Sequence, residues 1–226
     1  MVRGKKYQEI KKKIGPQKEY SLEEAIDLIK ENRIAKFDES IEIHLKLGID
    51  PNKTEQQVKG TVTLPYGGIK KKKIVCFVGP EKEKEAKEAG ADLVGGKELI
   101  EKIKQTKKID FDLAIASPEI MKELTPIAKI LGPKGLMPSP KTGTLTENIK
   151  EAIKEIKKGK TSFKNDEGGN LHQVIGKVSW QKEKIIANFK IFLEAVRKAK
   201  PPKTKGLYIQ KLVICSTMGP GIRIKL

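Results

Sequence analysis

The sequence predicts a combined α+β and α/β fold with two domains: an outer α+β domain split between both termini, and an inserted Rossmann-like α/β domain. Three observations lead to this prediction. The strands expected near both ends of the chain alternate polar and apolar residues, as antiparallel strands with one solvated face do. Residues 73–120 instead alternate short apolar strands with helices, a pattern typical of parallel pairing. Glycines mark both changes of pattern, namely Gly67, Gly68 and Gly159.

These glycines assign residues 1–67 plus 160–226 to the outer domain and residues 68–159 to the inserted one. Because glycine tolerates large changes of its backbone dihedral angles, Gly67, Gly68 and Gly159 are predicted to form a hinge between the domains. Two domains that follow one another along the chain are the alternative arrangement.

The outer domain is expected to begin with a basic arm through Lys13, followed by a helix that starts after Ser21. Ser21 and Glu24 have the spacing of a capping box. Residues 37–47 then form a strand with one covered and one solvated face. Ile41, Ile43, Leu45 and Leu47 point one way, and Ser40, Glu42, His44 and Lys46 point the other. A second strand is expected at residues 57–64.

The inserted domain is expected to contain three strands, each followed by a helix, at residues 73–78, 91–94 and 111–116. The helix after the third strand begins at Ser117, with Pro118 in its first turn. A loop rich in glycine and proline follows at residues 131–143, and a further helix ends at Gly159.

The alternating pattern returns after Gly159. Strands expected at residues 162–164 and 174–180 flank residues 165–169, whose composition is typical of a turn. A long helix ends at Pro201, and the last long strand covers residues 207–215. The turn at residues 215–221 carries hydroxyl groups, glycines and a proline, so its backbone is open to close approach by another part of the protein or by a partner.

The charge balance indicates a polyanionic partner. The chain has 47 Lys and Arg residues against 29 Asp and Glu residues, a formal net charge of +18. A field of this sign attracts nucleic acids and accelerates their encounter. A soluble surface rich in Lys and Glu, of the kind that thermophiles favour, is the alternative explanation. The size of the excess favours nucleic acid.

The cysteines and the hydropathy pattern favour the cytoplasm. Cys76 and Cys215 each lie in an apolar run without a CxxC motif, which indicates buried thiols and neither disulfides nor a zinc ribbon. The longest wholly apolar run covers residues 74–78, far short of the roughly 20 residues of a membrane helix. The first residues are basic and do not lead into an apolar signal region.

The motifs of the common enzyme classes are missing from the sequence. The turn at residues 79–83 lacks the G-x-G-x-x-G of a dinucleotide site, and Pro140 removes an amide from the phosphate-loop-like segment 135–142. His44 and His172 offer little material for a catalytic triad or a metal cluster. We therefore expect no catalytic residue, no cofactor and no metal ion.

RNA is favoured over DNA as the partner. Aromatic residues make up 5% of the chain, too few for a base-stacking sheet, and no helix-turn-helix pattern is present. Double-stranded RNA exposes 2′-hydroxyl groups in a shallow groove, which suits short polar side chains and backbone donors. Thr217, Met218 and Gly219, beside the strand face with Ser40 and Lys46, form such a set.

A secondary contact is predicted in the loop of the inserted domain. Gly132-Pro133-Lys134-Gly135 matches the short G-x-x-G pattern of nucleotide-clamping loops, and Lys134 and Lys141 would meet RNA there. A loop that only packs against the core is the alternative.

Five segments resemble one known family, the bacterial large-subunit ribosomal protein one (L-one) family. They occur in order over essentially the whole chain, at residues 36–44, 47–51, 90–96, 130–138 and 216–220. The resemblance implies two domains with one inserted in the other. It also implies binding to the mobile stalk of the large-subunit rRNA next to the tRNA exit site, and a part in the release of deacylated tRNA.

Other implied properties are a monomeric state outside the ribosome, no membrane partner, and repression of the protein's own operon mRNA through an rRNA-like leader. The implied partners are thus rRNA, exit-site tRNA and this mRNA. Matching the family's motifs residue by residue places the rRNA surface on Lys36, Phe37, Ser40, Lys46, Thr217, Met218 and Gly219, with Lys164 and Asp166 beside it. Relatives often have Thr at position 40, so Ser40 keeps the hydroxyl group and loses a methyl contact.

Each of these residues has an expected role. Lys36 and Lys46 would meet phosphates, which fixes register without reading sequence. Phe37 would pack under the edge of the RNA or hold the contact surface in place, or else it is an ordinary core aromatic residue. The two hydroxyl groups, on residues 40 and 217, would hydrogen-bond ribose or base groups. Met218 would add an adaptable apolar contact, and Gly219 would permit close approach of the backbone.

Overall fold

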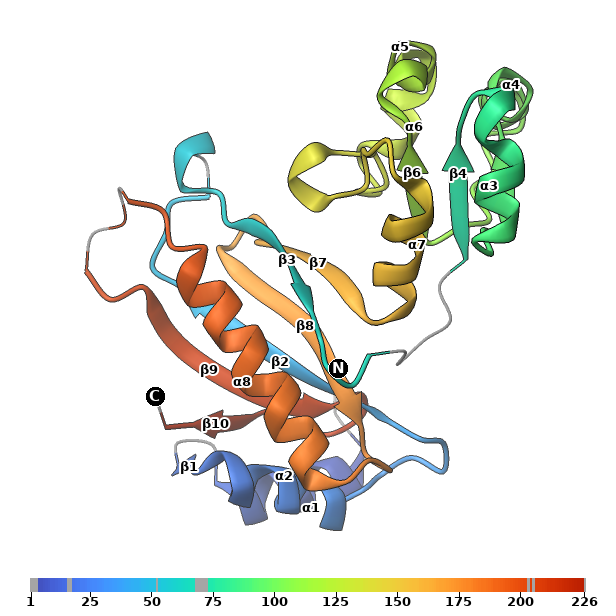
Figure 1. Ribbon diagram of the computed structural model, residues 1–226. Helices are drawn as coiled ribbons and strands as arrows, with labels where there is room; N and C mark the ends of the chain where they lie inside the picture. Colours follow the sequence, from blue (N-terminus) through green and yellow to red (C-terminus); the bar gives the residue numbers. More distant parts are fainter. Residues whose placement is uncertain are drawn as a thin grey trace. The chain divides into compact units, whose positions relative to one another are not determined.

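The computed structural model describes residues 4–15, 18–51, 53–67, 73–202, 204 and 206–225. The fold is mixed α/β, and the strands of the described residues form three sheets. Contacts divide the chain into two compact units: Met1–Ile69 with Thr161–Leu226, and Lys70–Lys160 (Figure 1). The assignment of these units to a split outer domain and an inserted Rossmann-like domain remains a prediction. So does the hinge, and its Gly68 lies outside the described residues.

A five-stranded sheet forms the centre of the first unit. Its strand order is β1 (Glu19–Tyr20), β10 (Ile222–Ile224), β9 (Ile209–Ser216), β2 (Ser40–Leu47) and β8 (Asn170–Lys177). The strand β2 lies antiparallel between β8 and β9, while the short β1 pairs in parallel with β10. Segments from both ends of the chain therefore meet in one sheet.

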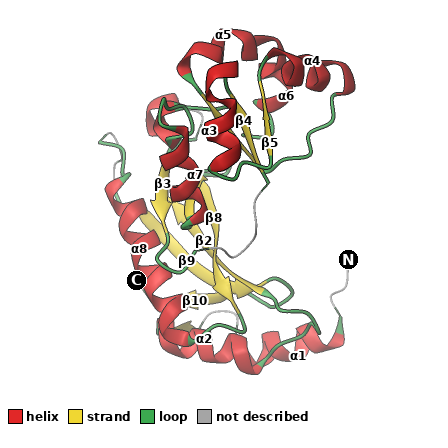
Figure 2. Cartoon of the chain, turned by 45° about the vertical axis from the view of Figure 1, so that its right-hand side comes forward, coloured by secondary structure: helices red, strands yellow, loops and turns green. Residues whose placement is uncertain are grey.

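Among its described residues, this unit contains three helices: α1 (Lys5–Ile14), α2 (Leu22–Glu31) and α8 (Lys182–Lys198). The helices α2 and α8 pack on one face of the sheet, as Figure 2 shows. The predicted alternation along β2 is confirmed, because Ile41, Ile43, Leu45 and Leu47 are buried in this core. The predicted capping box is also present, with Ser21 Oγ accepting from the Glu24 amide at 3.3 Å and Glu24 Oε2 accepting from the Ser21 amide at 3.0 Å.

Two expectations for this unit are wrong. The basic arm is the helix α1, because Ile14 is buried and Ile10 packs beside it, four residues apart on one helix face. The strand expected at residues 174–180 covers Asn170–Lys177 instead. It begins early because Asp166 closes the preceding turn, with Oδ1 accepting from the Asn170 amide at 2.6 Å. It ends early because Ser179 turns away to donate to the Asp38 carboxylate.

A smaller, two-stranded sheet of β3 (Lys59–Thr63) and β7 (Lys160–Lys164) completes the unit, together with the 3₁₀ turn η1 (Thr54–Gln56). The strand β3 packs on α8. Phe163 of β7 meets Phe192 of α8 edge to face, with 5.5 Å between the ring centroids. This contact joins the small sheet to the core of the first unit.

The second unit has a three-stranded sheet in the order β5 (Leu93–Gly95), β4 (Ile74–Phe77) and β6 (Leu113–Ala116), and both pairings are parallel, as predicted. All of β4 is buried: Val75 and Phe77 belong to one apolar cluster, and Ile74 and Cys76 to another. This two-sided burial explains the continuous apolar run of the strand. The helices are α3 (Glu83–Glu88), α4 (Lys97–Thr106), α5 (Met121–Leu124), α6 (Ala128–Leu131) and α7 (Ile149–Lys157).

The single helix expected from Ser117 is wrong. The chain there alternates the 3₁₀ turns η3 (Pro118–Ile120) and η4 (Thr125–Ile127) with α5 and α6. Proline lacks the amide that a continuous helix needs at position 126. Two further 3₁₀ turns are η2 (Pro80–Lys82) and η5 (Pro140–Thr142). Across the described residues, the helices all fall short of the length and apolar character required to span a bilayer.

Candidate nucleic-acid interface

One face of β9, β2 and β8 carries polar side chains, opposite the face on which α2 and α8 pack. Cross-strand pairing places Lys46 beside Lys211 and Asn170, and His44 beside His172. We call this surface the polar strand face; it consists of Ser40, Glu42, His44, Lys46, Asn170, His172, Lys211 and Cys215. The solvated face predicted for residues 37–47 is thereby confirmed, because the alternate residues of β2 are exposed or half-buried.

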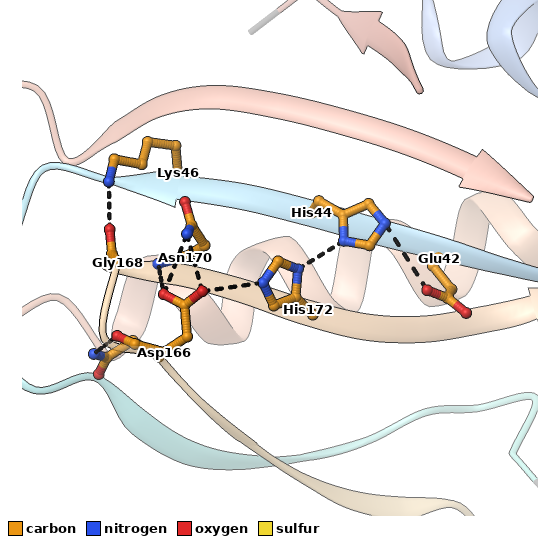
Figure 3. Close-up of polar contacts among 8 residues, drawn as sticks. Glu42, His44, Lys46, Asp166, Gly168, Asn170 and His172 are labelled. Carbon is orange, nitrogen blue, oxygen red and sulfur yellow. Dashed lines mark hydrogen bonds and ion pairs between the residues drawn. The ribbon is translucent and has the colours of Figure 1, made fainter. Parts of the chain in front are cut away.

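A chain of polar contacts runs along the polar strand face (Figure 3). His44 Nδ1 lies 2.7 Å from His172 Nδ1, and His172 Nε2 lies 3.4 Å from Asp166 Oδ2. The other ring nitrogen of His44, Nε2, lies 3.1 Å from Cys215 Sγ and 3.9 Å from Glu42 Oε2. At the end of the face, the Lys46 ammonium donates to the Gly168 carbonyl oxygen. The chain therefore joins an imidazole pair to a carboxylate at either end.

The surroundings of these groups shift their pKa values. Burial lowers the pKa of His44, and the neighbouring His172 lowers it further against the opposing effect of Glu42. The Asn170 side chain, aided by amides and His172 and opposed by partial burial, lowers the pKa of Asp166 to about 2. At neutral pH Asp166, beside the face, is therefore ionised and His44, on the face, is neutral.

A second surface adjoins the first and is built from residues 35–40 and 216–219; we call it the contact platform. The amide of Ser40 donates to Thr217 Oγ1 at 3.0 Å, and the amide of Thr217 donates to the Ser40 carbonyl at 3.0 Å. These reciprocal bonds hold together two segments that lie 177 residues apart in the sequence. The predicted proximity of Ser40 and Thr217 is observed.

Two apolar side chains are exposed on the contact platform. Phe37 is 55% exposed and Met218 is 51% exposed, while most large apolar residues of this unit are buried. Phe37 is therefore not a core aromatic residue, and that alternative is wrong. Lys36 and Thr217 are exposed as well. An exposed ring and an exposed thioether beside hydroxyl groups are suited to contact with riboses and bases.

Gly219 has a structural reason to be glycine that the sequence did not indicate. A Cβ atom at this position would lie 2.5 Å from Ser216 Oγ, which is closer than real side chains approach. Ser216 is buried and its hydroxyl group donates to Glu39. The space that a side chain at position 219 would need is thus occupied by the protein itself.

The sequence reasoning also missed residues that hold the contact platform. Glu39 is buried; its Oε1 accepts from the Ala35 amide at 2.8 Å, and its Oε2 accepts from the Met218 amide at 3.2 Å. The Lys177 ammonium donates to Ser40 Oγ at 3.0 Å. A signal for Glu39 was present, because its position has the same parity as the inward-facing residues 41 and 43. An acid on the covered face of a strand needs partners inside the protein.

The remaining predicted residues lie apart from the platform. Lys164 is exposed at the end of β7, two residues before Asp166, which closes the turn into β8. Lys134 and Lys141 belong to the second unit, where Lys134 is exposed in a turn closed by a bond from the Gly135 amide to the Gly132 carbonyl at 2.9 Å. Their contact with RNA remains a prediction.

The described residues contain no group of three or more His, Cys, Asp or Glu side chains arranged to hold a metal ion. The predicted burial of the thiols is correct for Cys76, but Cys215 is only half-buried, on the polar strand face. Burial raises the pKa of Cys76 to about 12, and burial with Glu42 raises that of Cys215 to about 11. Both residues are therefore protonated at neutral pH and unsuited to nucleophilic chemistry.

Comparison with known proteins confirms the resemblance found in the sequence. A family model described as "Ribosomal protein L1p/L10e family" matches residues 29–220. The large ribosomal subunit protein uL1 of Kosmotoga olearia is 50% identical over 222 residues, covering 98% of this chain and 96% of the relative. The uL1 proteins of Solibacter usitatus and Thermosipho melanesiensis are each 47% identical, covering 98% and 97% of this chain and 93% and 95% of the relatives.

These relatives are structural ribosomal proteins and not enzymes, which agrees with the missing catalytic motifs. The match extends over the whole contact platform and the polar strand face, because the matched residues include both. The chain therefore belongs to the ribosomal protein L1p/L10e family.

Proposed function

We propose that this protein is a structural component of the large ribosomal subunit that binds the mobile stalk of the large-subunit rRNA near the tRNA exit site. The observation that carries the proposal is the contact platform, where exposed Phe37 and Met218 stand beside the paired Ser40 and Thr217. The net charge of +18 supports a polyanionic partner. The names of the relatives support its assignment to the ribosome.

The two surfaces have different parts in this function. Lys46 on the polar strand face, and Lys36 at the edge of the contact platform next to it, attract phosphates and set the register of the RNA. The turn at residues 216–219 has no charged side chain, so it contributes shape, hydroxyl groups and apolar contact. Discrimination between RNAs then arises mainly at the platform.

The finer functions proposed are assistance in the release of deacylated tRNA and repression of the protein's own operon mRNA through a leader that resembles the rRNA site. The protein acts in the cytoplasm, on the ribosome, and is a monomer outside it. RNA is its partner in each case, and the chemistry requires no cofactor. These functions rest on the family membership and on the same platform.

A competition binding measurement tests the proposal. Labelled stalk rRNA fragment is bound to the protein and displaced by an unlabelled message leader or by an unrelated duplex of equal length. We expect the stalk fragment and the leader to compete, and the unrelated duplex to compete at least about a thousandfold less well. Equal competition by all three RNAs would contradict the proposal.

A further inference from the structure

Glu39 is an acidic residue in a position that the strand pattern reserves for apolar side chains. It precedes β2 on the side of Ile41 and Ile43, and none of its surface is exposed. An ionised carboxylate in such a place is costly unless donors surround it. Its role must therefore be sought in the groups that it contacts.

The two carboxylate oxygens bind two different segments of the chain. Oε1 accepts from the Ala35 amide at 2.8 Å, and Oε2 accepts from the Met218 amide at 3.2 Å. The Ser216 hydroxyl group and the Ile34 amide add further bonds. Burial alone would raise the pKa of Glu39, but these bonds outweigh it and lower the pKa, so the group is a carboxylate at neutral pH.

We propose that Glu39 is a positioning residue of the RNA interface, which locks the segment with Lys36 and Phe37 to the turn with Thr217 and Met218 and does not touch RNA itself. The inference rests on the proposed function. The two segments come from opposite parts of the chain, and the carboxylate bonds to both at once. Preorganised surfaces bind more tightly because ordering costs are met before the partner arrives.

This role predicts a specific kind of damage on substitution. In Glu39→Gln the amide nitrogen takes the place of one carboxylate oxygen, so it faces an N–H donor of Ala35 or Met218. One of the two segments then loses its bond, while Lys36 and Lys46 remain. The preference for the stalk fragment over other RNAs should therefore decrease, whereas the charge-driven affinity for any RNA should not.

The test compares Glu39→Gln with Glu31→Gln, an exposed acid at the end of α2 that lies outside both surfaces. Each change removes one negative charge, so attraction to a polyanion alone predicts slightly tighter binding for both. We expect Glu39→Gln to bind the stalk fragment about tenfold more weakly, as lost preorganisation implies. Its affinity for an unrelated duplex and the slope of log affinity against log salt should match those of Glu31→Gln, which should bind both RNAs at least as tightly as the wild-type protein does.

Ser216→Ala provides a second variant that keeps the Glu39 charge and removes one donor. Ser216 is 4% exposed, so its side chain is not available to RNA. A loss of selectivity in Ser216→Ala would therefore be an indirect effect, through the lost hydrogen bond to the Glu39 carboxylate. We expect the same pattern with a smaller loss. This variant keeps the inference testable if Glu39→Gln does not fold.

The outcomes separate this inference from the function on which it rests. If Glu39→Gln and Ser216→Ala both keep the wild-type preference for the stalk fragment, or lose affinity for the stalk fragment and the unrelated duplex equally, the role of Glu39 is wrong. The proposed function is not affected by either result. A wild-type protein without preference for the stalk fragment would overturn the proposed function, and this inference with it. Selectivity lost in Glu39→Gln and Ser216→Ala but kept in Glu31→Gln would establish it.

Discussion

The contact platform and the polar strand face meet at Ser40, the first residue of β2, yet they are held together by different contacts. The platform is joined by the buried carboxylate of Glu39 and by two bonds between distant segments, from the Ser40 amide to Thr217 Oγ1 and from the Thr217 amide to the Ser40 carbonyl. The polar strand face is joined by half-exposed side chains such as His44 and His172, and His172 also contacts Asp166 beside the face. Bonds inside the protein are worth more than bonds in contact with water. We therefore expect the platform, held by the buried Glu39, to be the more rigid surface and to select the RNA, and the strand face to be the more adaptable surface and to attract it.

The largest effect is expected from Thr217→Val, which would break this comparison at the platform. The substitution removes the acceptor of the Ser40 amide and a hydroxyl group for RNA. We expect the free energy of binding to the stalk rRNA to become less favourable by about 1–3 kcal/mol. Titration with the stalk fragment measures this, and circular dichroism checks the fold. Thr63→Val, on an exposed position of β3, is the control and should bind like wild type. Unchanged affinity in a folded Thr217→Val would remove the platform from the interface.

Lys46→Ala tests the polar strand face with a smaller expected effect. Loss of one phosphate contact should weaken binding to the stalk fragment and to an unrelated duplex by the same factor. It should also reduce the slope of log affinity against log salt by about 1. Lys190→Ala removes an equal charge from an exposed position on α8, on the covered side of the sheet, and should leave the slope unchanged. If Lys46→Ala loses affinity only for the stalk fragment and not for the unrelated duplex, Lys46 contributes to RNA selectivity as well as to attraction.

The pH dependence of binding sharpens the same comparison. Burial and His172 lower the pKa of His44 below its ordinary value of 6.5, so in the free protein the residue is mostly neutral at pH 6.5 and gains its proton as the pH falls further. Phosphates near the face would favour the charged form, so RNA affinity should rise as the pH falls from 7.5 to 5.5, by at most about tenfold per pH unit for one proton. Fold stability changes in the opposite direction, because the unfolded chain binds this proton more readily.

Binding titrations at several pH values measure this effect, with His44→Asn as the variant that should flatten the curve. The groups facing His44 are Glu42 on β2, His172 on β8 and Cys215 on β9, with Asp166 beyond His172. An equally steep curve in His44→Asn would assign the titration to another group.

The smallest effect on binding is expected from removal of the second unit. Joining the chain after deletion of residues 68–158 should leave a folded first unit that retains the stalk affinity of the full chain, since the platform lies wholly within it. Cooperative thermal unfolding and the same titration measure both properties. An unfolded product would favour two sequential domains over the split arrangement.

Local patterns made part of this fold predictable from the sequence. The period of two along β2 places Ser40 and Lys46 on the solvated side, and the capping box at Ser21 marks the start of α2. The continuous apolar run of β4 indicates burial on both faces. Each of these features depends on neighbours within a few residues.

Contacts between distant segments were harder to predict. The many lysines of α1 make its sequence look uniformly polar, so its apolar face is difficult to recognise. The start of β8 depends on the turn that Asp166 closes. The pairing of His44 with His172 needs the register of β2 and β8, which periodicity does not give. Glu39 is the clearest case, because its partners at residues 35 and 218 are joined only after the sheet has formed.

A salt series with two RNAs tests most directly whether attraction and selection are separate. The stalk fragment and an unrelated duplex of equal length are titrated with the wild-type protein between 50 and roughly 400 mM monovalent salt. If lysines supply attraction and the platform supplies fit, both affinities fall along parallel lines and their ratio stays constant. A ratio that shrinks toward one as salt rises would show that the preference itself is electrostatic, and would contradict the role of the platform.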